Sequence, residues 1–188
     1  MSNKILFSFL CVLISWSIFS CKENEPPISS KNKIYFDLTK IIQNDIQYNT
    51  TNNCAEEKTV YIQYNKETKK IDTVDWNKEL QPLLECDINR PAWKGQFFID
   101  TIPNELMKDT TLEYRALNDK ISIRTLSIIY TNQQIKKISI VKKIKSTLFS
   151  TSQIINYVPT VGFLIRGEQK ALFMNAFDLN IDVKYICK

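Results

Sequence analysis

The sequence predicts an α+β fold, in which a meander of about six antiparallel β-strands carries two or three helices packed on one face. Apolar residues recur at helical spacing in the first half of the chain. Apolar and polar residues alternate through the second half, and short polar links join the alternating segments. Helices followed by hairpin-connected strands favour this class over a parallel α/β fold.

Two helices are expected in the first half. Residues 35–47 place Leu38, Ile41, Ile42 and Ile46 on one helical face. Asp75 is the expected N-cap of a second helix, with apolar residues from Trp76 to Leu84 turned inward. Pro82 should kink that helix or split it in two, because its ring clashes with the carbonyl four residues back.

Strands are expected from the alternation and from the turn residues between the alternating runs. Residues 147–157 fit either a strand or a short helix, and 166–168 are expected to form a turn. The segments that alternate are 59–64, 70–74, 112–116, 120–130, 135–145, 162–165, 171–174 and 178–185.

Composition excludes many functional classes. The 188 residues contain no His and only 3 Gly, which removes His-based catalysis, His-ligated metals and glycine-rich phosphate loops. The net charge is only +5 and rests mainly on Lys, whereas nucleic-acid readers rely on Arg. We therefore expect no catalytic residue, metal, cofactor or nucleic-acid partner.

The N-terminus has the layout of a secretory signal peptide. Lys4 precedes the apolar run Ile5–Phe19, and the small residue Ser20 follows. This run is shorter than the roughly 20 apolar residues of a membrane-spanning helix. A Pro- and charge-rich stretch, typical of a flexible tether, begins directly after Cys21.

The segment Ile18-Phe19-Ser20-Cys21 resembles the lipobox of bacterial lipoproteins, although Phe19 stands where a small residue is usual. The resemblance implies diacylglycerol on the Cys21 thiol and cleavage before Cys21; the alternative is an ordinary secretory peptide whose Cys21 joins a disulfide. The expected parts are a signal peptide (1–20), a lipidated Cys with its tether (21–33) and one domain (34–188). The acidic residues Glu23 and Glu25 also resemble a surface-export signal of Bacteroidota lipoproteins.

Three further cysteines remain in the domain, namely Cys54, Cys86 and Cys187. In an oxidising envelope two of them are disulfide candidates, and the sequence leaves all three pairings open. The alternatives are buried free thiols or a reactive thiol, but no residue pattern indicates a lowered thiol pKa.

Other clusters have a structural and a functional interpretation. The acidic residues between 72 and 87 suit a carboxylate hydrolase, or a helix cap and ion pairs; they are Asp72, Asp75, Glu79, Glu85 and Asp87. Lys137, Lys143 and Lys145 form either a solvated strand face or a stripe for anionic headgroups. Trp93, Phe97 and Phe98 fill the core or line a pocket.

Two short patterns, at 75–80 and 87–91, resemble small envelope lipoproteins of Bacteroidota. In that setting the tripeptides around Thr73, Thr101 and Thr110 resemble O-glycosylation sites. The layout is also compatible with the curved half-barrel of lipoprotein carriers.

The sequence therefore predicts a non-enzymatic outer-membrane lipoprotein that serves as a binding or assembly module and is held at the membrane by its lipid. The alternatives are a carrier of an apolar ligand, or a carboxylate hydrolase. A carrier should have an apolar cavity, whereas an assembly subunit should have an exposed apolar patch.

Overall fold

A computed structural model describes residues 33–172 and 176–187. The predictions for residues 1–32, including the signal peptide and the lipidated Cys21, lie outside the described residues. The elements are α2 (Leu38–Thr51), β1 (Ala55–Ile62), β2 (Asn65–Ile71), α3 (Trp76–Glu79), α4 (Gln81–Leu84), the 3₁₀ turn η2 (Pro91–Trp93), β3 (Phe97–Asn104), β4 (Asp109–Ala116), β5 (Ile123–Thr131), β6 (Gln134–Lys145), β7 (Phe149–Val158), β8 (Gly162–Ala171) and β9 (Phe177–Ile186).

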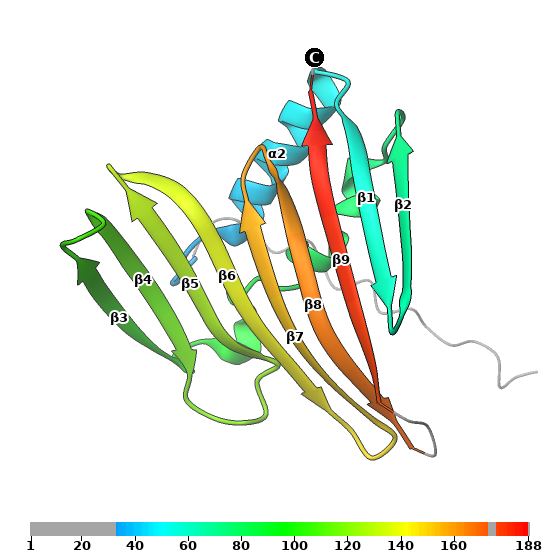
Figure 1. Cartoon of the computed structure of the whole chain (residues 1–188). Helices are drawn as coiled ribbons and strands as arrows, with labels where there is room; N and C mark the ends of the chain where they lie inside the picture. Colours follow the sequence, from blue (N-terminus) through cyan, green and yellow to red (C-terminus); the bar gives the residue numbers. More distant parts are fainter. Residues whose placement is uncertain (1–32, 173–175, 188) are drawn as a thin grey trace, which may run out of the picture. The chain divides into compact units, whose positions relative to one another are not determined.

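All nine strands belong to one antiparallel sheet, in the order β2-β1-β9-β8-β7-β6-β5-β4-β3 (Figure 1). Strands β3 to β9 follow the chain as a continuous meander. The early hairpin β1–β2 then extends the sheet beside the last strand, β9. The first and last strands of the domain are therefore neighbours, and β2 and β3 are the two edges.

The predicted fold class is wrong. Strands dominate the described residues, the sheet has nine strands rather than about six, and the three α-helices are short. The Phe97–Asn104 strand was not expected, because its first residues do not alternate and Pro103 lies within it. The expected turn at 166–168 is also wrong, because β8 runs straight through it and pairs with β7 and β9. Residues 147–157, which were ambiguous, lie mainly in β7.

Gly167 explains why β8 looked interrupted. Its backbone lies against β7 so closely that a Cβ atom would come within 2.8 Å of the Gln153 side chain and 3.0 Å of the Ser152 carbonyl oxygen. The glycine therefore provides room for packing rather than a turn. By contrast, the turn between β5 and β6 consists of Asn132 and Gln133, both with positive φ, as a two-residue hairpin loop requires.

Helix α2 lies on one side of the sheet, here called the inner face (Figure 1). Asp37 caps its N-terminus by accepting a hydrogen bond from the Lys40 amide. Its buried side chains form one helical stripe and meet apolar side chains of the central strands. The stripe consists of Leu38, Ile42, Asp45 and Asn49. The fully buried side chains of the central strands include Ile123, Leu126, Ile128, Ile138, Ile140 and Tyr157.

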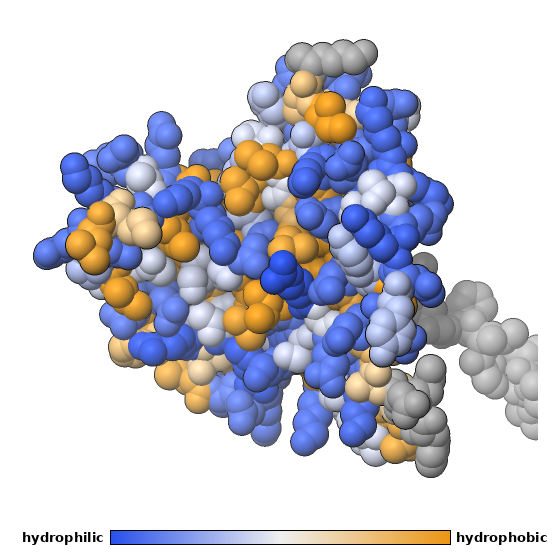
Figure 2. All heavy atoms as spheres, in the orientation of Figure 1, coloured by the Kyte–Doolittle hydropathy of each residue, from blue (hydrophilic) through white to orange (hydrophobic). Residues whose placement is uncertain are grey.

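The second helical segment is divided as expected. Asp75 caps α3, α3 ends at Glu79, and Pro82 lies in the first turn of α4, where its missing N–H costs no hydrogen bond. Both short helices contact α2. The opposite, outer face of the sheet has no helix of the described residues against it. Figure 2 shows hydrophobic side chains there in separate patches among hydrophilic ones.

Candidate functional site

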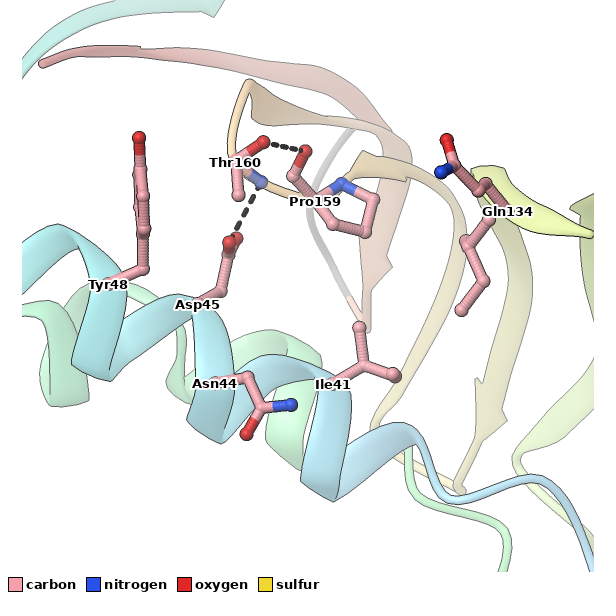
Figure 3. Close-up of a pocket in the computed structure, with 8 residues that line it drawn as sticks. Ile41, Asn44, Asp45, Tyr48, Gln134, Pro159 and Thr160 are labelled. Atoms are coloured by element: carbon pink, nitrogen blue, oxygen red, sulfur yellow. Dashed lines mark hydrogen bonds between the residues drawn. The ribbon is translucent and has the colours of Figure 1, made fainter.

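An open groove lies between α2 and the turns that follow β5 and β7 (Figure 3). Its volume is about 440 Å³. The lining side chains are largely apolar, with amide groups at the rim. They are Ile41, Asn44, Asp45, Tyr48, Gln134, Ile135, Pro159 and Thr160.

Asp45 is buried at this groove and joins α2 to the sheet. One carboxylate oxygen accepts a hydrogen bond from the Tyr157 hydroxyl at 2.7 Å. The other accepts one from the Thr160 amide at 2.8 Å, which Figure 3 shows. Burial raises the pKa of Asp45, against the opposing effect of both hydrogen bonds. Because each oxygen is already engaged, we interpret Asp45 as a structural junction.

A second buried polar group lies where β1 pairs with β9. Glu56 is opposite Tyr185, and Lys58 on the same face of β1 forms an ion pair with Glu79 of α3 at 2.7 Å. Burial raises the pKa of Glu56 to about 7, and the negative charge of Glu79 adds to the effect. Sequence reasoning missed Asp45 and Glu56, because a lone acid in an amphipathic segment is normally exposed.

The carboxylates proposed from the sequence have separate partners. Asp75 caps α3, Glu79 is paired with Lys58, and Glu85 lies 3.5 Å from Lys142. Asp87 is buried and accepts hydrogen bonds from the Thr39 hydroxyl and from Asn89. Asp72 is exposed, near Lys70. This arrangement does not place two of them across a cleft, as a glycosidase needs.

Cys54 and Cys187 form a disulfide that joins the start of β1 to the end of β9, across 133 residues of sequence. Cys86 is a buried free thiol. Burial raises the pKa of Cys86 to about 11, which leaves it protonated at neutral pH.

The three aromatic residues after the helices divide between the two faces. Phe97 is buried and Trp93 packs against the core. The ring of Phe97 makes edge contacts with the rings of Tyr35 and Trp93. Phe98 points to the outer face, where Arg115 lies 5.1 Å above its ring. Lys137, Lys143 and Lys145 share the outer face of β6, opposite the buried Ile138 and Ile140.

The glycosylation candidates Thr73, Thr101 and Thr110 are all exposed. Thr73 lies in the connection from β2 to α3, and the other two lie on neighbouring strands at the β3 side of the sheet. Thr110 also lines a second open hollow, of about 470 Å³.

Strand β3 exposes several apolar side chains at one edge of the sheet. Phe98 is 50% exposed, Ile99 48% and Ile102 44%. At the end of the strand, Leu106 and Met107 in the turn to β4 continue the apolar surface. The strand contains one charged residue, Asp100, which lies 3.3 Å from Arg115. Here the term β3 edge means residues 97–107.

Within residues 33–172 and 176–187, no strand pairs with the main chain of β3 on the side away from β4. Leu117 donates its amide to the Gln96 carbonyl, which makes those two residues a hydrogen-bonded pair. Such pairs recur at every second residue in an antiparallel ladder, so the alternate positions Phe97, Ile99 and Thr101 direct their main-chain groups away from β4. Pro103 occupies the next outward position, where the missing N–H costs no ladder hydrogen bond.

No protein-family model matches the chain, and no curated protein or solved structure matches it significantly. Among the residues that the structure describes, no helix has the length and apolar character needed to cross a membrane.

Proposed function

We propose that the chain is a lipid-anchored, non-enzymatic protein of the bacterial outer membrane whose domain is a binding module. Its partner contributes an extended segment that pairs with β3 as an additional strand. The supporting observation is the β3 edge, which combines outward main-chain donors and acceptors with exposed apolar side chains. An edge strand without Lys and with exposed apolar side chains is unusual, because edges are normally blunted against pairing, and Pro103 blunts only the last residues of β3.

The chemistry of the partner segment follows from this edge. It supplies main-chain groups to Phe97, Ile99 and Thr101, and apolar side chains that cover Phe98 and Ile102 on the outer face. Arg115 lies 3.3 Å from both Asp100 and Glu113, so it only partly offsets the negative charge of Asp100 near the centre of the edge. The lipid on Cys21 keeps the domain at the membrane where such partners lie.

A carrier of an apolar ligand is the second candidate, and it rests on the groove beside α2. Ile41, Ile135 and Pro159 give this groove an apolar lining, and its volume is within the range of small-molecule sites.

Native mass spectrometry of the gently extracted, full-length protein distinguishes the candidates. We expect the acyl mass on Cys21 together with a partner protein, or with a second copy as that partner. In the double variant Ile99→Lys/Ile102→Lys, the amount of bound partner should fall at least tenfold, because Lys on an edge opposes strand addition. The control Thr68→Lys on the β2 edge should retain it.

Three outcomes would contradict the proposal. Retention of the partner by the Ile99→Lys/Ile102→Lys variant would exclude the β3 edge as the binding surface. A bound lipid in place of a protein would support the carrier. Membrane association of a Cys21→Ala variant equal to that of the parent would exclude the lipid anchor.

A further inference from the structure

A second exposed apolar surface lies at one end of the sheet, away from the β3 edge. The turns β1–β2, β6–β7 and β8–β9 all lie at this end (Figure 1). Tyr64 is fully exposed, Leu148 is 65% exposed and Leu172 is 50% exposed. We call Ile62, Tyr64, Leu148, Phe149 and Leu172 the apolar rim.

Hydrogen bonds hold these turns together. The Leu172 amide donates to the Leu148 carbonyl at 2.7 Å, which joins the β8–β9 turn to the β6–β7 turn. The Gln63 amide donates to the Asp178 carbonyl at 3.1 Å, which fixes the β1–β2 turn beside the start of β9. These hydrogen bonds hold the residues of the rim together at this end of the sheet.

Lysines lie directly behind the rim on the outer face. Ser150 pairs with Lys145 of β6 and with Lys170 of β8, so the last outer-face row of these three strands carries two exposed lysines and no acid. The next row contains Lys143, Glu168 and Asp178. The positive charge is thus concentrated in the row nearest the turns.

The apolar rim and the row of Lys behind it follow the order of environments at a bilayer surface, in which the apolar acyl chains lie beneath the charged headgroups. Apolar side chains enter the boundary between headgroups and acyl chains, and ammonium groups remain at the level of anionic headgroups. We propose that the apolar rim contacts a phospholipid bilayer with anionic headgroups, and that this contact orients the domain on the membrane. The inference uses the proposed lipid anchor, which brings the domain to the bilayer.

The β3 edge then points away from the turns that touch the lipid, because it runs along the side of the sheet rather than across its end. Membrane contact and strand addition can therefore occur together. Leu106 and Met107, at the other end of the strands, belong to the β3 edge and not to the rim (Figure 1).

The test uses the full-length lipidated protein in vesicles that contain phosphatidylglycerol and lipids brominated on their acyl chains. A Leu148→Trp variant places a reporter in the rim. The control Asn132→Trp places the same reporter in an exposed turn at the opposite end of the sheet. After subtraction of the parent fluorescence, quenching should be at least threefold stronger at position 148, and Lys145→Gln/Lys170→Gln in that background should reduce it.

Equal quenching at the two positions would overturn the rim proposal. Flotation with the vesicles tests the anchor separately, because a Cys21→Ser variant should remain unbound or bind weakly. A Leu148→Trp protein that floats with the vesicles but shows no quenching at position 148 contradicts only the rim. A Cys21→Ser variant that floats as the parent does contradicts only the anchor.

Discussion

The two edge strands of the sheet differ in charge and in support. Strand β2 carries Lys66, Lys69 and Lys70 within seven residues, whereas β3 carries no Lys and exposes Phe98, Ile99 and Ile102. The hairpin that contains β2 is also tied down by the Cys54–Cys187 disulfide and by the ion pair between Lys58 and Glu79. Lysines are a common device against edge-to-edge pairing. The comparison shows that the lysines of β2 oppose pairing with a further strand, whereas β3 lacks this protection and is able to pair.

Loss of the disulfide should have the largest effect on stability, and mainly on the β2 side. The disulfide closes a loop of 133 residues, for which the chain-entropy argument gives about 5 kcal/mol. We expect Cys54→Ser/Cys187→Ser to lower the unfolding free energy by that order, as measured with urea. Amide exchange should increase in β1 and β2 more than in β3 and β4. Equal loosening of both sides would contradict the assigned difference between the edges.

Removal of the lysines should convert the protected edge into a pairing edge. In a Lys66→Thr/Lys69→Val/Lys70→Thr variant we expect the rate of self-association to rise about tenfold, because strand pairing at β2 is no longer opposed by charge. Light scattering at several protein concentrations measures this rate. The matched control replaces Lys137 on the interior strand β6 with Thr, and it should leave the rate unchanged.

Glu56 should make the β1–β9 junction sensitive to pH. The pKa of Glu56 in the folded protein, about 7, lies above its ordinary value of 4.5. The contribution of the protonated Glu56 to the stability of the folded protein is therefore complete below pH 4.5 and is lost as the pH rises through 7. The unfolding free energy of Glu56→Gln, relative to that of the parent, should therefore rise by about 1 to 2 kcal/mol between pH 5 and pH 8, after allowance for solvent screening. Urea melts across this range measure the gain.

The control for this pH dependence is Glu57→Gln. Glu57 follows Glu56 in the same strand but is exposed on the outer face, so its variant should show no such gain. A Glu56→Gln variant whose stability relative to the parent stays the same from pH 5 to pH 8 would contradict the assignment, because the Glu56 carboxyl would then have the same pKa in the folded and unfolded states.

Phe98 should contribute little to stability and much to binding. Half of its side chain is exposed, and its contact with Arg115 is of the surface cation–π kind, worth about 0.5 to 1 kcal/mol. Phe98→Ala should therefore cost only about 1 to 2 kcal/mol of unfolding free energy, while it weakens partner retention. A double-mutant cycle with Arg115→Ala isolates the contact. A larger loss of stability would mean that β3 is part of the core rather than a free edge.

Particular residues show where sequence reasoning succeeded and failed. The cap at Asp75 and the division at Pro82 were predicted correctly, because both depend on backbone geometry within one turn of a helix. The turn at Gly167 and the missing β3 strand were errors. Gly167 is set by contact with β7, and β3 owes its pairing to β4 rather than to its own alternation. Which cysteines pair was also left open, since pairing depends on β1 lying beside β9.

By itself, the sequence determined the Asp75 cap, the division at Pro82 and most of the strands of the meander, because these depend on residues close together in the chain. It also carries the chemical basis of the proposed anchor, in Cys21 and the residues before it. Only the tertiary structure decided that the early hairpin joins β9, that Asp45 and Glu56 are buried, and that β3 is left as an open apolar edge. Those features follow from contacts between residues distant in sequence, which local patterns do not specify.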